Sequence, residues 1–148
     1  GIWLVKGTAL NRIGRRKEAK EAFQMSLELH VKAILEDPGD LSLKRMKGLT
    51  LYNLGRYEES LEVYDKVLEA SPRIEPYVID VSALEGKGDA LRALNRNQEA
   101  LEAYNEAIAL APSSSAAWHG KGEAERELGQ VGNAGMSLST ADKLGYEK

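Results

Sequence analysis

The sequence predicts an all-α fold in which four antiparallel helix pairs, about eight helices, stack into a solenoid. The dipeptide Lys-Gly occurs four times in the 148 residues, always in the same frame. Twelve residues after each glycine stands a small residue, and sixteen after it an aromatic residue or leucine. The glycines, Gly7, Gly48, Gly88 and Gly122, are separated by 41, 40 and 34 residues. A frame that recurs in this way indicates one copied structural unit, and such units bury their apolar faces by stacking.

Each copy is predicted to contain two helices joined by a tight turn. The first helix ends seven positions after the repeated glycine, at a residue type that tolerates positive φ. The second helix begins two or three residues later. In the third copy its apolar residues recur at spacings of three and four, which places them on one helical face. The turn residues are Gly14, Gly55, Asn95 and Gly129, and the apolar residues of the third copy are Ala100, Leu101, Tyr104, Ala107 and Ile108.

The four copies are approximately residues 1–38, 39–72, 73–112 and 113–148, and together they are predicted to form a single domain. A mid-helix glycine costs about 1 kcal/mol relative to alanine, so four of them at one repeat position need a packing reason. We expect the missing β-carbon to let the two helices of a pair approach closely. The preceding lysines are expected to lay their stems along the helix and keep the ammonium groups in water. The small residues expected opposite the glycines are Ala19, Ser60, Ala100 and Ala134.

Two insertions, of seven and six residues, interrupt the underlying period of 34. The first lengthens the second helix of copy one to roughly 16–36, and seven residues are almost two helical turns, so the buried stripe stays in phase. The second insertion is expected to start the following helix early, with Pro76 as its first residue. Both extensions lie at a junction between two copies, on the same rim of the stack. They either form a ridge together on that rim, or each covers only the helix next to it. The ridge would bring Val31, Ile34 and Leu35 near Tyr77 and Val78.

The residues that recur in this frame resemble the tetratricopeptide repeat, which has a 34-residue period and a Trp, Gly, Ala, Phe, Pro pattern. The resemblance covers nearly the whole chain and implies a right-handed superhelical array. Copies two and four depart from the pattern, with Lys44 and Glu125 in place of large apolar residues. The last helix carries Gly132 and Gly135 and is expected to be the least stable, as suits a terminal cap. The matching residues include Trp3, Gly7, Leu10, Gly14, Ala19 and Phe23 in copy one, Leu84, Leu91, Tyr104 and Pro112 in copy three, and Trp118, Gly122, Gly129 and Ala134 in copy four.

The resemblance also implies a concave groove, lined by the first helix of each pair, that binds a peptide or a partner helix. The first half of this surface is expected to be apolar to neutral with one arginine, and the second half to alternate in sign. The alternative is that Asp89 with Arg92, and Glu123 with Arg126, only form ion pairs within one helix. Each such pair would stabilise its helix by roughly 0.2–0.5 kcal/mol. The twelve positions carried over from the family are Leu4, Thr8, Asn11, Arg45, Leu49, Tyr52, Glu85, Asp89, Arg92, His119, Glu123 and Arg126.

One sub-family can be excluded from the residues at its binding positions. Chaperone adaptors with this repeat clamp an acidic C-terminal tail with lysine, asparagine and arginine side chains from three repeats. None of the matching positions here agrees, so we expect no carboxylate-clamp activity. The residues at those positions are Leu4, Thr8, Met46, Ser82 and Gly86.

Composition narrows the remaining function classes. The chain is 43% hydrophobic and can bury a core, while a formal net charge of −3 and a pI near 5.5 argue against a nucleic-acid binder. Without cysteine there is no disulfide, thiol nucleophile or thiolate metal site. No apolar run approaches a membrane span. The chain has neither an initiating methionine nor a signal-peptide pattern, so we expect a cytoplasmic fragment of a longer protein.

Little in the sequence could carry chemistry. The histidines, His30 and His119, lie on different copies, and neither has a metal-ligand partner at the required spacing. His30 is expected on the exposed side of its helix, and His119 on the inner side of the stack. We therefore predict no catalytic residue, no metal and no cofactor. The expected function is a non-catalytic scaffold that binds a protein or peptide in the groove. One alternative is self-association, or docking to the rest of its own protein, through the solenoid ends or the extended-helix rim. Another is that the chain is part of an enzyme whose catalytic domain lies outside this segment.

Overall fold

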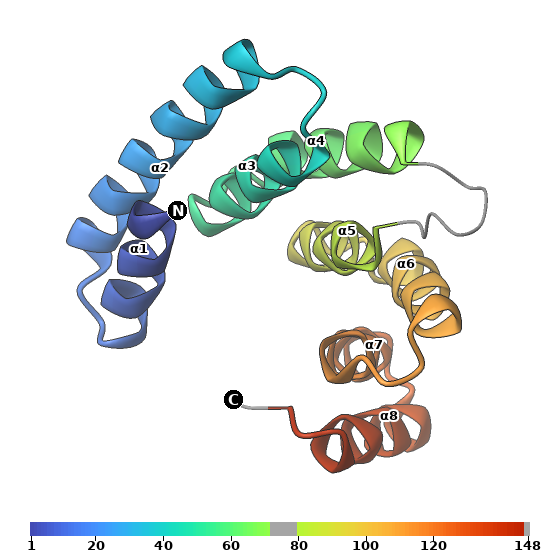
Figure 1. Ribbon diagram of the computed structural model, residues 1–148. Coiled ribbons are helices and arrows are strands. Elements are labelled where there is room, and N and C mark those ends of the chain that lie inside the picture. The colour runs from blue at the N-terminus through green and yellow to red at the C-terminus, as the bar shows by residue number, and fades with distance from the viewer. Residues whose placement is uncertain (72–79, 147–148) are drawn as a thin grey trace. The chain divides into compact units, whose positions relative to one another are not determined.

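The computed structural model describes residues 1–71 and 80–146, and in these residues it contains eight helices and no strand (Figure 1). The prediction of an all-α fold with eight helices is confirmed. Short turns join α1 to α2, α3 to α4, α5 to α6 and α7 to α8, as expected for helix pairs. They are α1 (Ile2–Arg12), α2 (Arg16–Glu36), α3 (Leu41–Asn53), α4 (Tyr57–Ala70), α5 (Val81–Ala93), α6 (Asn97–Leu110), α7 (Ser115–Glu127) and α8 (Val131–Lys143).

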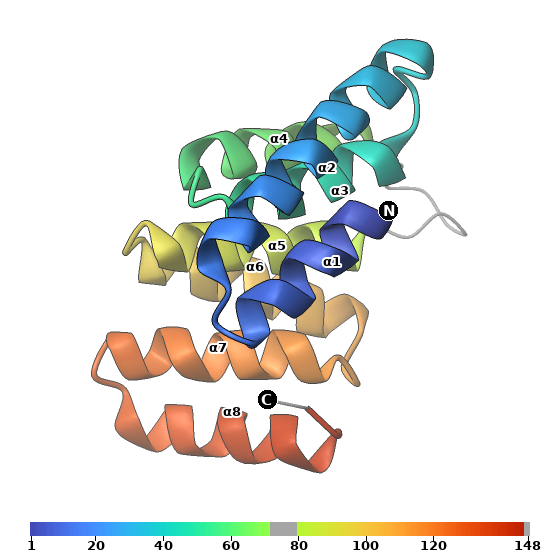
Figure 2. The same cartoon turned by 90° about the vertical axis from the view of Figure 1, so that its left-hand side faces the viewer.

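The chain divides into two compact units, Gly1–Val67 and Leu68–Lys148. In the first unit α1 packs on α2, and α2 packs on α3. In the second unit each helix from α5 to α8 packs on the next one, and α5 also contacts α7. Figure 2 shows α7 and α8 lying side by side as one such pair. Each unit is therefore built by the stacking of successive helices that the repeat predicts.

The four predicted turn residues all have positive φ. Gly14, Gly55 and Gly129 have φ between 75° and 80°, and Asn95 has φ 60°. A fifth residue of this kind, Gly145, follows the last helix with φ 83°. The sequence reasoning missed this turn, although it uses the same residue type.

The repeated glycines allow the two helices of a pair to approach closely, as expected. The group packed against each glycine, however, is a large side chain and not only the small residue that was expected there. A β-carbon on Gly7 would lie 2.5 Å from the ring of Phe23, and one on Gly88 would lie 2.6 Å from the ring of Tyr104. Each glycine therefore receives the side chain sixteen positions later, from the second helix of its own pair. The small residue twelve positions later is buried beside it, and Ser60 donates a hydrogen bond to the carbonyl of Gly48 at 2.8 Å.

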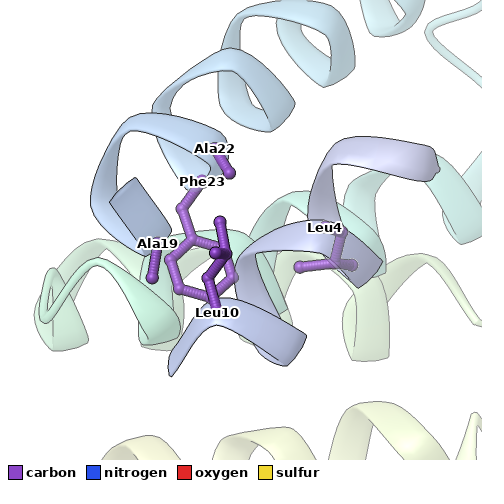
Figure 3. Close-up of a cluster of buried hydrophobic side chains, with 5 residues drawn as sticks. All are labelled: Leu4, Leu10, Ala19, Ala22 and Phe23. Atoms are coloured by element: carbon purple, nitrogen blue, oxygen red, sulfur yellow. The ribbon is translucent and has the colours of Figure 1, made fainter. Parts of the chain in front are cut away.

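Figure 3 shows this packing in the first unit. The Phe23 ring of α2 lies against Leu10 of α1, beside the buried methyl groups of Ala19 and Ala22. Trp3 and Met46 cover the cluster from the side. The lysine before the glycine adds a contact that was not expected. The Lys6 ammonium lies 4.9 Å from the Trp3 ring centroid, within reach of a cation–π interaction.

The first predicted extension is confirmed, because α2 runs over 21 residues from Arg16 to Glu36. The second extension fails at its boundary with α5. Asp80 has extended backbone angles and caps the helix, with its carboxylate accepting from Ala83 N–H at 3.1 Å. A helix beginning at Pro76 therefore cannot run on into Val81. Pro76, Tyr77 and Val78 themselves lie outside the described residues, so the ridge stays a prediction.

A capping signal for α5 was present in the sequence. Asp40, Asp80 and Ser114 each stand eight residues before the repeated glycine of their copy. Each side chain accepts a hydrogen bond from the backbone three residues later, which satisfies a donor that the helix leaves unpaired. Aspartate and serine are among the preferred N-cap residues, so this recurrence predicts where three of the first helices begin.

The prediction that His30 is exposed is wrong. Its side chain is buried, with 6% of the residue exposed, because it faces α3 rather than solvent. Its Nδ1 lies 3.3 Å from the hydroxyl of Thr50, which donates to the Met46 carbonyl at 2.9 Å. Ser26 lies 3.5 Å from the same hydroxyl. The extended α2 thus meets α3 through a short polar chain inside the first unit.

Burial lowers the pKa of His30 below its ordinary value, and the positive amino group of Gly1 adds to the effect. The folded protein therefore resists a proton that the unfolded chain accepts near pH 6.5. Since the unfolded state then binds more protons, the free energy of unfolding should fall as the pH drops below about 6.5. Urea denaturation of the wild type and His30→Gln, at roughly pH 7.5 and pH 5, measures this. The stability difference between the two proteins should change with pH, and a constant difference would contradict a buried neutral imidazole.

Glu125 replaces an apolar residue without leaving a gap in the last pair. It is buried and accepts a hydrogen bond from Ser137 of α8 at 2.7 Å. The hydrogen bond satisfies a carboxylate that would otherwise be costly to bury. In contrast, Gly132 and Gly135 of α8 face open space, and no atom lies within 4 Å of a β-carbon built on either.

Candidate functional site

Six of the twelve predicted groove positions lie in the second unit, on α5 and α7. Glu85, Asp89 and Arg92 follow one another at helical spacing along α5, and all three are half-buried. On α7, His119 and Glu123 are half-buried and Arg126 is exposed. The two helices contact each other, so these side chains share one face of the unit, called here the α5–α7 face.

The charged side chains of this face are linked between the helices. Arg92 Nη1 of α5 lies 4.0 Å from Glu123 Oε2 of α7, and Glu123 also pairs with Arg126 of its own helix. Ser114, the N-cap of α7, donates a hydrogen bond to Glu85 of α5. Glu123 therefore pairs both within its own helix, with Arg126, and across to Arg92 of α5, so these charges are more than pairs within one helix. The contacts between the helices hold the charged side chains of the α5–α7 face in defined positions.

Asp89 serves the core as well as the surface. Its carboxylate accepts a hydrogen bond from the Tyr104 hydroxyl at 2.6 Å. Burial raises the pKa of Asp89, and burial together with the Asp89 charge raises the pKa of Tyr104. The Tyr104 ring in turn fills the space above Gly88 of α5 and Gly120 of α7. This tyrosine, which the sequence analysis assigned only to the core, therefore ties Asp89 to the packing of three helices.

His119 is covered by a residue that the sequence analysis did not select. The rings of His119 and Tyr146 are stacked, with centroids 4.0 Å apart and planes at 9°. Burial raises the pKa of Tyr146, and the charges of Asp89, Arg92 and Glu123 act on its hydroxyl. Tyr146 therefore lies over the α5–α7 face. A sequence signal existed, because Tyr146 stands 24 residues after Gly122, where the two preceding copies have proline 24 residues after Gly48 and Gly88.

The first unit places its predicted positions differently. Leu4 is only 7% exposed and belongs to the core cluster of Phe23, so its prediction as a groove residue is corrected. It is buried because it belongs to the cluster that α1 forms with Ala19, Ala22 and Phe23 of α2. The Thr8 hydroxyl is exposed but donates to the Leu4 carbonyl at 3.0 Å, and Asn11 is exposed.

On α3 the exposed groove position is apolar. Leu49 is 43% exposed, while Arg45 and Tyr52 are half-buried. The Tyr52 ring lies 5.4 Å from that of Tyr57 at the start of α4, in a tilted arrangement. The predicted groove positions of α1 and α3 thus include one charged residue, Arg45, whereas those of the α5–α7 face include five charged residues and His119.

The described residues also bear on two further classes of site. None of the helices there has both the length and the apolar character to cross a membrane. Within the same residues, histidine and carboxylate side chains nowhere gather in the groups of three that a metal ion would need.

Comparison with known proteins identifies the repeat. Two models of the tetratricopeptide repeat match the chain, over residues 4–73 and 40–113. No curated protein sequence matches it. Among solved structures, TTC0263, a thermophilic repeat protein of Thermus thermophilus, aligns over 97% of this chain and 73% of its own, with a TM-score of 0.72 and 22% identity.

Two MamA proteins show the same fold. MamA of Desulfovibrio magneticus RS-1 aligns over 97% of this chain and 74% of its own, with a TM-score of 0.65 and 22% identity. MamA of MSR-1 aligns over 96% of this chain and 94% of its own, with a TM-score of 0.64 and 20% identity. One of the two family models alone spans half of the sequence, and these structures share its helical architecture. The chain therefore belongs to the tetratricopeptide repeat family.

Proposed function

We propose that this protein is a non-catalytic interaction module that binds a segment of a partner protein on its α5–α7 face. The observation that carries the proposal is that polar side chains of two neighbouring helices are linked to each other. The hydrogen-bond acceptors Glu85 and Glu123 and the donor Arg92 are all half-buried on α5 and α7. Side chains already held in place lose little conformational freedom on binding, so such a face is preorganised for a ligand.

The face fits a peptide better than a small molecule or nucleic acid. Its charges alternate in sign, with Glu85 and Asp89 beside Arg92 and Glu123 beside Arg126, which suits the alternating polar groups of a polypeptide. Polyphosphate ligands would instead require a basic surface. The residues found at the carboxylate-clamp positions, such as Leu4 and Gly86, do not suit an acidic C-terminal tail. The expected ligand is therefore an internal segment or a helix of a partner.

Selection from a displayed peptide library, with the 148-residue protein as bait, tests the proposal. Enriched peptides should bind Glu123→Gln about tenfold or more weakly than the wild type, a loss of roughly 1.4 kcal/mol. The matched control is Glu102→Gln on the exposed surface of α6, which should bind as the wild type does. Equal affinities for wild type, Glu123→Gln and Glu102→Gln would place binding away from the α5–α7 face.

Self-association is the second candidate, and exposed apolar residues on α8 favour it. Val131 is 75% exposed and Met136 is 67% exposed, and both lie on α8, the last helix of the second unit. Exposed apolar side chains that gather on one element are typical of contact surfaces. Light scattering over a concentration series separates the two functions, because a protein that stays monomeric at every concentration does not assemble through α8.

A further inference from the structure

We propose that the α5–α7 face has a specific position for an aromatic side chain over His119, which the partner's segment fills with a tyrosine or phenylalanine, and that the protein's own Tyr146 occupies this position when no partner is bound. The inference deepens the proposed function and rests on it. It names the chemistry of the partner and a competitor within the same chain.

A turn at the end of α8 brings Tyr146 to His119. Gly145 N–H donates to the Asp142 carbonyl and Tyr146 N–H to the Ala141 carbonyl, each at 3.1 Å. These two bonds, with φ 83° at Gly145, form a Schellman motif that reverses the chain at the end of a helix. In Figure 2 the chain leaves the end of α8 and doubles back on the α7 side of that helix. The reversal places the side chain of the residue after the glycine over α7.

The ends of α2 and α6, the second helices of copies one and three, differ from the end of α8. Asp37 after α2 and Ala111 after α6 have extended angles, with φ −131° and −136°, and each precedes a proline. An extended residue before proline leads the chain onward to the next repeat. After α8, Leu144 has φ −84° and ψ 3°, and Gly145 takes positive φ. Where tyrosine stands in place of the repeat proline, the chain therefore reverses at Gly145 instead of continuing in an extended conformation.

The rings of Tyr146 and His119 are in close, nearly parallel contact. The ring planes differ by only 9° at a centroid distance of 4.0 Å, so His119 offers its full face to an aromatic ring. Around the stack lie Asp89, Arg92 and Glu123, whose charges act on the Tyr146 hydroxyl. An aromatic ring with a polar edge satisfies both parts of this environment, and tyrosine is among the residues enriched in protein interfaces.

The contact is also suited to displacement. Tyr146 is half-buried, and the segment that carries it is held by the two backbone bonds of the turn and by one ring stack. Because the residue is tethered, its local concentration at His119 is high, and a partner must compete with it. The apparent affinity of the partner equals its intrinsic affinity multiplied by the fraction of molecules in which the position is open.

The experiment uses a defined probe, the acetylated and amidated peptide Lys-Leu-Gly-Tyr-Glu-Lys, which repeats the last six residues of the chain. It is titrated into the 148-residue wild type, Tyr146→Ala, and Tyr146→Ala combined with His119→Ala, with the ring-proton shifts of His119 and the backbone amide shifts as readout. The peptide should bind Tyr146→Ala at least about tenfold more tightly than the wild type. It should bind the double variant no better than the wild type, and the same peptide with alanine in place of tyrosine should not bind.

Tyr146→Phe is the matched variant, since phenylalanine keeps the stack and should exclude the peptide as the wild type does. Circular dichroism melts of all variants show that the helices remain folded. Equal binding to wild type and Tyr146→Ala, or absence of binding to Tyr146→Ala, would overturn the inference and make Tyr146 a purely structural cap. Either result leaves the proposed function standing if the library-selected peptides still lose affinity for Glu123→Gln, so the two failures are distinguishable.

Discussion

Replacing Tyr104 with alanine is expected to lower the free energy of unfolding by about 3–5 kcal/mol. The residue is only 1% exposed, and its ring lies against Gly88 of α5 and Gly120 of α7 while its backbone belongs to α6. Truncation removes the group that fills the space between three helices. It also removes the hydrogen-bond donor of the half-buried Asp89 carboxylate, which adds the cost of an unsatisfied polar group.

Urea denaturation followed by circular dichroism measures this loss, with Tyr104→Phe as the control that removes the hydroxyl alone. Phenylalanine should cost about 1–3 kcal/mol, the range for leaving a buried acceptor unpaired. Because repeat proteins can unfold in stages, the comparison should use the transition that reports the second unit. A loss below about 1 kcal/mol for Tyr104→Ala would contradict a ring packed between three helices.

The substitution of glycine by leucine should have opposite effects at two helical positions of the second unit. Gly88→Leu introduces a β-carbon 2.6 Å from the Tyr104 ring and a side chain beyond it, and should destabilise by about 1–3 kcal/mol or more. Gly135→Leu meets no atom within 4 Å and replaces a poor helix former by a good one, so it should stabilise by up to about 1 kcal/mol.

The urea midpoints of the two variants, each compared with the wild type, measure the difference. Since both changes involve the same two amino acids in helix interiors, the opposite signs depend on the surroundings of the glycine alone. Two shifts of the same sign would show that the repeated glycine has no special packing role.

The fold could be read from the sequence because its information is local and repeated. Gly14, Gly55, Asn95 and Gly129 each mark a turn by their tolerance of positive φ, and each stands seven residues after the repeated glycine of its copy. The N-cap at Asp80 was equally local, but the six-residue insertion beside it suggested a longer helix instead. Recurrence across copies was the better guide at that boundary.

The functional face was predictable only in part. The resemblance selected Arg92 and Glu123, and the structure joins them across two helices, but spacing along one chain could not reveal that pairing. Leu4 is buried although its repeat position was expected to line the groove, since the repeat frame does not specify how far a side chain turns toward the neighbouring helix. The stack of Tyr146 on His119 depends on a chain reversal at Gly145. The repeat frame marks Tyr146 as a departure from the proline of the two preceding copies, but it does not show which residue the tyrosine ring contacts.

Binding of a partner segment to the α5–α7 face is the proposal on which the others depend. Amide chemical-shift mapping with a library-selected peptide tests it, because every described helix reports in the same titration. We expect the largest shifts to gather at Glu85, Arg92, His119 and Glu123. Shifts confined to the exposed residues of α8, at Val131 and Met136, would contradict binding at this face.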